Sequence, residues 1–522
     1  MRKLPIGLQY FEGLRLDNYV YVDKTQYLYN LAEGGKYYFL SRPRRFGKSL
    51  FLSTIRAYFE GKRKLFAGLK IVELTQDDPT AWQAHPVFHF DFTGADYSNE
   101  NALEAILDEH LRRWEETYAL NGKGITLGER FRNLLIQANR QSGLRCVVLV
   151  DEYDKPLLEA TNNPPLLDAN KNLFKGFFST LKGFDRYIRF AFITGVTKFT
   201  KVSIFSDLNQ LDDISLQKKF AGICGITEEE LLNNFQPEIS ELAIDKSLTV
   251  EECIKTLKER YDGYHFHSEA VGVYNPFSLL KAFSAREFGA YWFASGTPTF
   301  LVNKMVAAGF DLRKLTNKNL RVTEARLANY RGEENDPIPL LYQTGYLTLA
   351  GYDNVRNQYL LKVPNQEVEY GLLECLLPSY IPPLTVGNDM DIYTLGDYID
   401  SGDLDGIKNV ITAIFANIPY TTAATPFEHY FQTVIYLVFK LLGRFTQCEM
   451  FTATGRVDCI VQAANYIYLF EFKRDSTAKA ALEQIEAKEY ALPFVADKRS
   501  LYKIGVAFDS KTRLVSDWLV AE

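Results

Sequence analysis

The sequence has no excess of positive charge and few residues of the kinds that build adaptable interaction surfaces. Its 59 Lys and Arg residues stand against 65 Asp and Glu residues, which gives a net charge of −6, and it contains only 4 Met and 4 Trp. A basic field normally draws nucleic acid to a protein, so a polyanion would have to bind here at a local patch or a metal site. The composition therefore excludes binding through overall charge.

The sequence also lacks long apolar runs and paired cysteines. No apolar run reaches the roughly 18 residues that a membrane-spanning helix needs, and the start, MRKLPIGLQYFEG, has no signal-peptide stretch. The six cysteines are scattered without a CxxC pair, which is typical of reduced, buried thiols. We therefore expect a cytoplasmic protein without a membrane segment.

The first half of the chain alternates strand and helix patterns. With 522 residues, of which 47% are hydrophobic, two to four globular domains are expected. Apolar runs typical of buried parallel strands occupy residues 36–40, 86–92, 146–150 and 188–196. Helical patterns lie between them at residues 49–58, 102–118, 131–138 and 169–181. This alternation predicts an α/β fold, a parallel sheet with helices on both faces.

The second half divides into a helical part and a mixed part. Residues 222–330 are mostly helical in pattern, for example at 228–234 and 250–261, and residues 337–349 indicate a short helix, a turn and a strand. A polar stretch rich in Asp and Gly at residues 387–402 is typical of a domain boundary. Beyond it we expect a helix at 427–442, strands, a helix at 478–490 and a strand at 502–508.

A candidate phosphate-binding loop lies where the first strand gives way to a helix, in FLSRPRRFGKSLFLSTI. Its FGKS matches the end of the pattern GxxxxGK[ST]. In such a loop Gly47 lets backbone N–H groups approach phosphate, Lys48 reaches the outer phosphates and Ser49 ligates Mg²⁺. The pattern departs at its start, because Arg42 stands where the first Gly belongs and Pro43 removes one N–H. The alternative interpretation is a basic surface turn before a helix.

An acidic strand end strengthens the nucleotide interpretation. Residues 147–150 are apolar and run directly into Asp151 and Glu152. In P-loop ATPases the first acid holds Mg²⁺ through water and the second polarises the attacking water. Alone, this would be a buried strand capped by acids. After the loop, and separated from it by another strand, it favours an ATPase of the subclass with a catalytic Glu.

Further polar residues are candidates for contacts with phosphate. Thr194 ends the strand at 188–196, where it could sense the γ-phosphate or only cap the strand. Arg44, Arg45 and Lys198 could each face phosphate or belong to a solvated basic face.

The C-terminal part contains a predicted hairpin, in which GRVDCIV and YIYLFEFK flank a turn. If the turn occupies residues 462–465, Asp458 lies opposite Leu469, on the face that also carries Glu471 and Lys473. A slip by one residue would move Asp458 to the other face. The expected register therefore gathers two carboxylates and an ammonium.

That face suits a divalent metal that activates water for attack on phosphate, with Lys473 steadying the nucleophile. Glu428, on the helix of PFEHYFQTVIYLVF, could supply another acid, and Gln484 in ALEQIEAKEY a polar contact. The alternative for the E-x-K triplet alone is a solvated strand face. Other candidate ligands, which packed or surface positions explain better, are His265, His267 and His429.

These motifs and the stretches around them resemble a family of predicted bacterial AAA-type ATPases. The likeness rests on LPIGLQYFEGLR, YVYVDKT, FLSRPRRFGKSLFLSTIRAYFEGK, VVLVDEYDKPL, FITGVTKFTKVSIFSDLN, YNPFSLL, YWFASGTPTFL and LLYQTGYLTL. In that family a PRRFGKS loop replaces the fuller P-loop pattern. The segment FE…GRVD…EFK…QI is similar to the PD-(D/E)XK nuclease superfamily domain that usually ends these proteins.

The resemblance implies ATP contacts at Gly47, Lys48 and Ser49, and acids linked to Mg²⁺ at Asp151 and Glu152. To these the strand and loop patterns add Arg45 and Thr194 as candidate nucleotide contacts.

In the nuclease fold the resemblance implies metal or catalytic roles for Glu428, Asp458, Glu471 and Lys473. The hallmark Gln484 is present. The position four residues later, which is often Tyr in the superfamily, is Lys488 here, and the nearest Tyr is Tyr490.

We therefore predict a P-loop ATPase over residues 1–220, a helical, winged-helix-like connector over 221–385 and a restriction-endonuclease-like α/β domain over 386–522. The predicted function is ATP-regulated cleavage of nucleic acid, with DNA as the first candidate and Mg²⁺ in both sites. The AAA-type resemblance favours a homo-oligomer, although the sequence shows no clear arginine finger.

Two alternatives stay open. One is a nucleotide-dependent switch or scaffold whose nuclease fold binds without cleaving, which the charge of −6 favours. The other is a working nuclease joined to an ATPase fold that no longer binds nucleotide, which Arg42 and Pro43 favour. The complete acid set at both sites favours the enzyme.

Overall fold

The computed structural model describes residues 2–120, 126–198, 210–294, 299–308, 310, 320–328, 336–380, 392–416, 434, 436–442, 445–451, 456–512 and 514–521. The chain forms two compact units, Met1–Gly296 with Lys318–Val368, and Thr297–Asn317 with Glu369–Glu522. Each unit has its own five-stranded sheet. None of the helices that the structure describes is long and apolar enough to cross a membrane.

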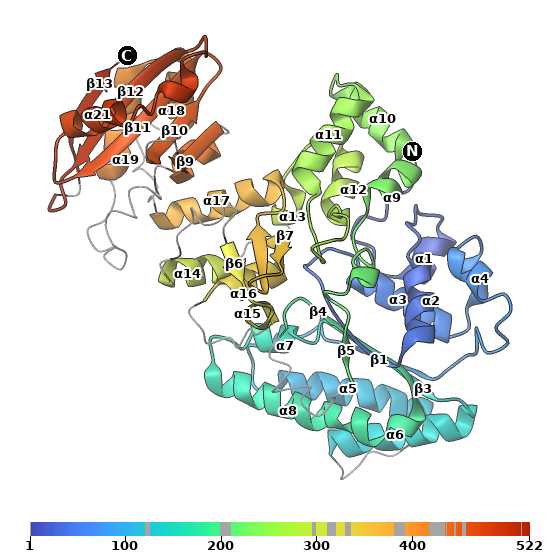
Figure 1. Cartoon of the computed structure of the whole chain (residues 1–522). Coiled ribbons are helices and arrows are strands. Elements are labelled where there is room, and N and C mark those ends of the chain that lie inside the picture. The colour runs from blue at the N-terminus through green and yellow to red at the C-terminus, as the bar shows by residue number, and fades with distance from the viewer. Residues whose placement is uncertain are drawn as a thin grey trace. The chain divides into compact units, whose positions relative to one another are not determined.

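A parallel sheet forms the centre of the first unit (Figure 1). Its strands are β1 (Tyr37–Ser41), β2 (Val87–Asp91), β3 (Cys146–Asp151), β4 (Ile188–Gly195) and β5 (Asp212–Asp213). They lie in the order β2-β3-β4-β1-β5, and every pair is parallel. The predicted strands and the α/β fold class are confirmed. The strand that lies between β1 and β3 in space is β4.

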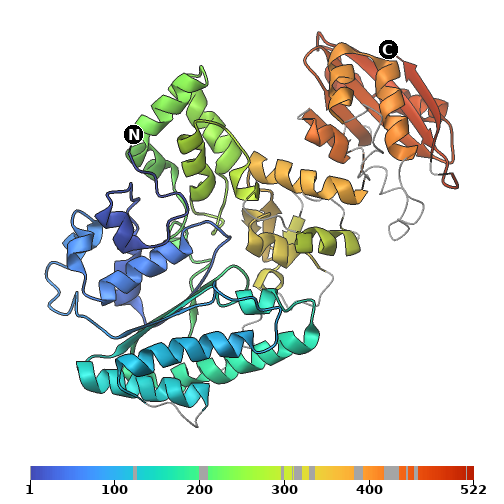
Figure 2. The same ribbon diagram turned by 180° about the vertical axis from the view of Figure 1, so that it is seen from behind.

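Helices cover both faces of this sheet (Figures 1 and 2). On one face lie α2 (Thr25–Gly34) and α3 (Lys48–Phe59), and on the other α5 (Ala102–Thr117), α6 (Leu127–Ser142) and α8 (Pro164–Gly183). The sandwiched strand β3 is buried along its whole length, as an apolar strand between two helical layers should be. The Phe90 ring packs against Trp114, Phe131 and Phe177 of the second layer. Shorter helices are α1 (Phe11–Leu16), α4 (Lys70–Leu74) and α7 (Lys155–Leu158).

A helical group follows the sheet in the same unit. It comprises α9 (Glu228–Asn234), α10 (Gln236–Asp245), α11 (Val250–Tyr261), α12 (Pro276–Ala285) and the short α13 (Tyr291–Ala294). Capping boxes begin α9 at Thr227 and α11 at Thr249, where each Thr exchanges hydrogen bonds with a Glu three residues later. These helices share one apolar core, which includes Leu231, Ile239 and Leu257.

A small antiparallel sheet completes the first unit. Its strands, β6 (Leu320–Val322), β7 (Thr348–Asp353) and β8 (Gln358–Lys362), lie in the order β6-β8-β7, with α15 (Glu324–Ala328) and α16 (Ile338–Thr344) between β6 and β7 in the chain. The helix, turn and strand expected at residues 337–349 are therefore present. The helix α17 (Gln366–Tyr380) follows.

The second unit contains a mixed sheet. Its strands are β9 (Phe445–Phe451), β10 (Arg456–Gln462), β11 (Tyr466–Arg474), β12 (Ser500–Phe508) and β13 (Val515–Ala521), in the order β13-β12-β11-β10-β9. Only β11 and β12 are parallel. The helix α21 (Ala478–Ala487) packs on β11 and β12. Other helices of this unit are α14 (Thr299–Ala307), α18 (Ile392–Ser401), α19 (Leu404–Ala416) and residues 436–441.

Two details differ from the sequence-based expectations. Residues 392–401, which we expected to belong to a domain boundary, form the helix α18. Leu395 and Ile399, four residues apart, are fully buried, and the Tyr468 hydroxyl donates to the Ile399 carbonyl at 2.7 Å. This apolar spacing outweighs the polar composition of the stretch. The last strand, β13, was not predicted.

Candidate functional site

The loop between β1 and α3 closes around Lys48. Gly47, the residue before the helix, adopts φ +92°, a left-handed conformation that glycine takes without strain. The buried Lys48 ammonium donates hydrogen bonds to the carbonyl oxygens of Arg42 at 2.9 Å and Pro43 at 3.0 Å. Ser49 lies in the first turn of α3, at the positive end of the helix dipole. The three predicted loop residues therefore meet at one helix start.

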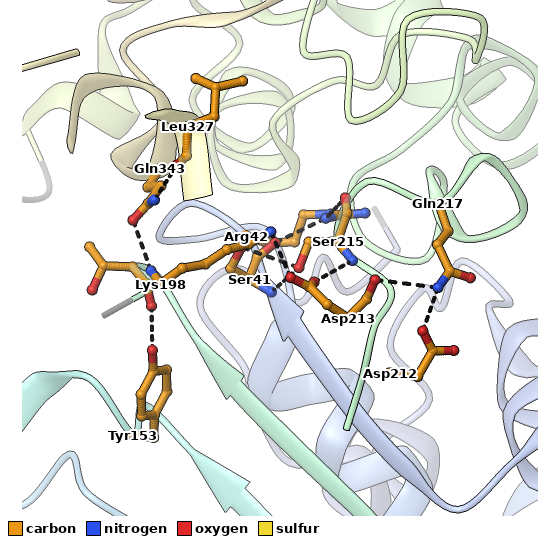
Figure 3. Close-up of polar contacts among 11 residues, drawn as sticks. Ser41, Arg42, Tyr153, Lys198, Asp212, Asp213, Ser215, Gln217, Leu327 and Gln343 are labelled. Atoms are coloured by element: carbon orange, nitrogen blue, oxygen red, sulfur yellow. Dashed lines mark hydrogen bonds and ion pairs between the residues drawn. The ribbon is translucent and has the colours of Figure 1, made fainter. Parts of the chain in front are cut away.

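Arg42 anchors the loop to the protein (Figure 3). The side chain is 1% exposed, and its guanidinium donates to the carbonyls of Ser41 at 2.9 Å, Ser215 at 2.8 Å and Phe220 at 3.1 Å. It also lies 3.9 Å from the centre of the Phe266 ring. Burial lowers its pKa to about 10. The residue that replaces the first Gly of the pattern thus binds protein carbonyls and fastens the loop to the segment after β5.

The acids at the end of β3 lie beside the loop. Asp151 is 4% exposed and accepts a hydrogen bond from the Thr194 hydroxyl at 2.6 Å, because β4 lies directly beside β3. Burial raises the pKa of Glu152, an effect that the Lys48 ammonium opposes. Burial also lowers the pKa of Lys48, and the negative charges of Glu152 and Asp151 oppose this effect. The structure therefore brings the predicted Lys48, Asp151, Glu152 and Thr194 into one electrostatic environment.

Asp154 is a further carboxylate at this edge, which the sequence analysis did not single out. It is 1% exposed and accepts hydrogen bonds from the N–H groups of Val196 and Thr197 and from the Thr197 hydroxyl. The Tyr153 hydroxyl adds a bond to the Thr197 carbonyl at 2.9 Å. Asp154 thus holds the backbone that follows Thr194. Its spacing of three residues from Asp151 was the available signal.

Lys198 lies in a buried network just after this turn (Figure 3). Its ammonium pairs with Asp213 at 3.0 Å, and its backbone N–H donates to the Gln343 side-chain oxygen at 2.8 Å. The Gln343 amide in turn donates to the Leu327 carbonyl at 2.6 Å. In the structure Lys198 therefore bonds to protein groups, whereas the sequence had left open a contact with phosphate or a place on a solvated face.

Arg44 and Arg45 are exposed at the tip of the loop. The Arg45 guanidinium lies 5.0 Å from the centre of the Phe277 ring. The Arg44 carbonyl accepts a hydrogen bond from the Trp292 indole at 3.0 Å. Contacts between these two side chains and phosphate stay a prediction.

A second polar cluster lies between β10, β11 and α21. The Lys473 ammonium donates to Glu471 at 3.2 Å and to the Gln484 side-chain oxygen at 2.6 Å. The Gln484 amide donates to Glu471 and contacts the Tyr490 hydroxyl at 3.4 Å. The Asp458 carboxylate accepts the Phe472 N–H at 2.9 Å. Tyr490, six residues after Gln484, therefore reaches the Gln through the fold.

The observed hairpin register differs from the expected one by two residues. Leu469 pairs with Ile460, and Cys459 with Phe470, so the next pair brings Asp458 opposite Glu471. The turn is tighter than we predicted, because the Ala463 N–H donates to the Tyr466 carbonyl at 2.9 Å and leaves only Ala464 and Asn465 between these two residues. Since side chains alternate with a period of two, a shift by two residues leaves Asp458 on the expected face.

Glu471 is the most strongly perturbed group of this cluster. It is 2% exposed, and one of its carboxylate oxygens has no hydrogen-bond partner. Burial, and next the charge of Asp458, raise its pKa to about 7. A buried carboxylate that has one oxygen without a partner and lies beside a second carboxylate is the arrangement that a cation would stabilise.

The donor set fits magnesium better than zinc. Among the described residues no group of three His, Cys, Asp or Glu side chains gathers to hold a metal ion. Mg²⁺ commonly uses one or two carboxylates and keeps several waters, which Asp458 and Glu471 can satisfy. Glu428 and His429, the other predicted ligands of this domain, lie outside the described residues.

His265 and His267 have local backbone partners. The His265 ring nitrogen Nδ1 lies 3.2 Å from the Ala270 carbonyl, and the His267 Nδ1 accepts the Glu269 N–H at 3.1 Å. These bonds account for both histidines without a metal.

Family models match both the N-terminal and the C-terminal part of the chain. Residues 5–205 match a family model described as predicted AAA-ATPase, and residues 426–518 match one described as PD-(D/E)XK nuclease superfamily. The chain is 37% identical over 532 residues to the uncharacterized protein in the vnfD 5′ region of Azotobacter chroococcum mcd 1, with 99% of each chain covered. Among solved structures, the chain has a match to the Aeropyrum pernix ORC2 protein in its ADPNP–ADP complexes. The similarity covers 68% of this chain and 90% of that one, at 11% identity and a TM-score of 0.24.

Proposed function

Because the chain belongs to the family of predicted AAA-ATPases that carry a C-terminal PD-(D/E)XK nuclease superfamily domain, we propose that it is an ATP-regulated nuclease. ATP with Mg²⁺ binds and is hydrolysed at the loop between β1 and α3. The cluster at Asp458 and Glu471 cleaves nucleic acid, with DNA as the first candidate. The nucleotide state controls that cleavage.

In the ATPase site each predicted residue has a separate role. Gly47 lets the backbone approach phosphate, and Lys48 leaves the carbonyls of its own loop to bind the outer phosphates. Ser49 and Asp151 would hold the Mg²⁺ that accompanies the nucleotide. Glu152, whose pKa is raised by burial, orients and polarises the attacking water. Thr194 and Arg45 complete the predicted nucleotide contacts, and Thr194 does so through Asp151.

The nuclease half rests above all on the buried Glu471 oxygen that has no partner beside Asp458. A divalent cation bound there supplies a Lewis acid for a phosphodiester. Lys473 steadies the attacking water, and Gln484 holds Lys473 in place through the bond at 2.6 Å. Glu471 accepts from both of these side chains, so its position sets theirs.

The proposal extends to the organisation of the chain. We assign the ATPase to residues 1–220, the connector to 221–385 and the nuclease to 386–522, with Glu428 as a further metal ligand. Homo-oligomers are expected from the AAA-type family, and a cytoplasmic location from the cysteines, five of which are free thiols in the structure.

The test is a cleavage assay on single- and double-stranded DNA and RNA with Mg²⁺ or Mn²⁺, with and without ATP. Asp458→Ala should lower the rate of cleavage by about two orders of magnitude, because it removes one of the two carboxylates that would hold the metal ion. Lys48→Ala should change the ATP dependence while cleavage itself persists.

Other outcomes would redirect the assignment. Cleavage that is equal with and without ATP and in Lys48→Ala would rule out the coupling. Bound ATP without cleavage of any substrate would establish the alternative, a nucleotide-dependent switch whose nuclease fold only binds.

A further inference from the structure

Two carbonyl groups of the phosphate loop are held by residues far along the chain. The Trp292 indole N–H donates to the Arg44 carbonyl at 3.0 Å, and the Gly225 N–H donates to the Phe46 carbonyl at 3.2 Å. Both donors lie beyond residues 5–205, which match the ATPase family model. The loop is therefore fastened from outside the ATPase segment.

The geometry of the peptide unit gives these two bonds a consequence. In a planar trans peptide the C=O of one residue and the N–H of the next point in opposite directions. Holding the carbonyls of Arg44 and Phe46 therefore turns the N–H groups of Arg45 and Gly47 to the opposite side of the loop. Within the described part of the chain, neither of these N–H groups donates to a protein acceptor.

The backbone of the loop has the curvature of an anion-binding site. Arg45 and Gly47 both adopt left-handed conformations, at φ +68° and +92°. Alternating left-handed residues gather successive N–H groups into a concavity that binds anions. Arg45 carries a side chain, so its left-handed conformation persists only where surrounding contacts hold it. The bond from Trp292 to the preceding carbonyl is such a contact.

Trp292 itself is held rigidly. It is 6% exposed, its backbone N–H donates to the Glu367 carboxylate at 2.7 Å, and its ring lies 5.2 Å from that of Tyr346. Gly345, at φ +94°, lies so close to Pro43 of the loop that a Cβ atom there would come within 2.8 Å of the proline ring. The loop thus has a close-packed support on the side of Trp292.

We infer that Trp292 is a positioning residue of the phosphate site. Its indole N–H orients the peptide between Arg44 and Arg45 so that the Arg45 N–H is presented to the phosphates of the nucleotide. This assignment rests on the proposed nucleotide site and adds to it a residue of the connector. Nucleotide affinity then depends on the packing of the connector against the loop.

The test compares Trp292→Phe with Trp82→Phe. Both variants keep an aromatic ring and lose one indole hydrogen bond, but that of Trp82 goes to the Thr75 hydroxyl, away from the loop. Calorimetric titrations with ATP and with inorganic pyrophosphate measure the binding of phosphates with and without the attached adenosine. We expect Trp292→Phe to weaken both ligands by the same factor, roughly fivefold, the effect of one ordinary hydrogen bond. Its KM for ATP should rise by that factor with kcat nearly unchanged, and Trp82→Phe should match the wild type.

The outcomes separate this inference from the proposed function. If the wild type binds neither ATP nor pyrophosphate, the proposed nucleotide site is wrong. If it binds both, and Trp292→Phe binds them equally well, the positioning role is wrong. If Trp292→Phe fails to fold, the same titrations are made with Gly345→Ala. Its added methyl group would press on Pro43 of the loop from the side on which Trp292 lies. Weaker pyrophosphate binding then supports the inference, and unchanged binding overturns it.

Discussion

At the scale of single residues, the surroundings decide what side chains of one type do. Arg42 is buried and binds three carbonyls, whereas Arg45 is exposed over a phenylalanine ring. Asp151 accepts a hydroxyl beside the loop, whereas Asp154 accepts backbone N–H groups and holds a turn. The sequence shows the charge of each of these residues, but the partners come from elements that are distant in the chain.

Glu367 should make the stability of the first unit depend on pH. It is 5% exposed, one carboxylate oxygen has no partner, and burial raises its pKa from 4.5 to about 7. Because the pKa of Glu367 is higher in the folded state than in the unfolded state, the folded state binds the proton more tightly. Stability is therefore lost as the pH rises from 4.5 to about 7. The loss amounts to about 3 kcal/mol at most. Urea unfolding of the wild type and Glu367→Gln between about pH 5 and 8 measures it. The variant should lack this part of the pH dependence, and parallel profiles would contradict the assignment.

At the scale of elements, single side chains connect segments that no local pattern relates. Gln343 on α16 accepts the N–H of Lys198 after β4 and donates to the Leu327 carbonyl at the end of α15 (Figure 3). Gln343 is 4% exposed, so both bonds are shielded from water. The backbone that follows Thr194 is therefore held from the connector as well as by Asp154.

Replacing Gln343 should destabilise the first unit. Gln343→Ala removes the two hydrogen bonds that Gln343 makes with the buried Lys198 N–H and the Leu327 carbonyl, which should lower the free energy of unfolding by about 2 kcal/mol. Gln217→Ala is the matched control, because its amide bonds with Asp212 and Asp213 lie near the surface. Thermal unfolding measures both variants. Equal losses would show that the Gln343 bonds have no special weight.

The elements of the sheets were largely predictable from local patterns. The four long strands of the first sheet and the helices between them lie where hydrophobic periodicity indicated. The hairpin register was wrong by two residues, yet the face of Asp458 was right, because the side-chain alternation is insensitive to such a shift. The helix at 392–401 was missed because its composition is polar, although Leu395 and Ile399 have helical spacing.

At the scale of the whole molecule, the first compact unit extends beyond the segment that resembles an ATPase. It includes Met1–Gly296 and Lys318–Val368, whereas the ATPase family model matches residues 5–205. Two of the three carbonyl acceptors of Arg42, the rings around Phe46 and the Trp292 bond come from beyond residue 205. The phosphate loop is thus part of a larger core.

A fragment of residues 1–220 should therefore not behave as an independent module. It would expose Phe46, which is 1% exposed in the whole chain and packs against Tyr264 and Phe266. We expect this fragment to aggregate or unfold without cooperativity, whereas a fragment of residues 1–368, which ends where the first unit ends, should unfold cooperatively. Calorimetry and size-exclusion chromatography distinguish the two. A shorter fragment that folds cooperatively and binds ATP would show that the connector is dispensable.

The sequence by itself determined the residue types of the two predicted sites and most of the elements that carry them. FGKS at a helix start, two acids at a strand end and D…E-x-K in a hairpin depend on contacts between near neighbours, and the periods of strands and helices express such contacts directly. The tertiary structure alone decided that Arg42 is an anchor, that β4 places Thr194 beside Asp151, that Trp292 bonds to the phosphate loop, and that Gln343 holds the backbone after β4. These partners come together only when the core packs, because no local period encodes a contact between residues so far apart in the chain.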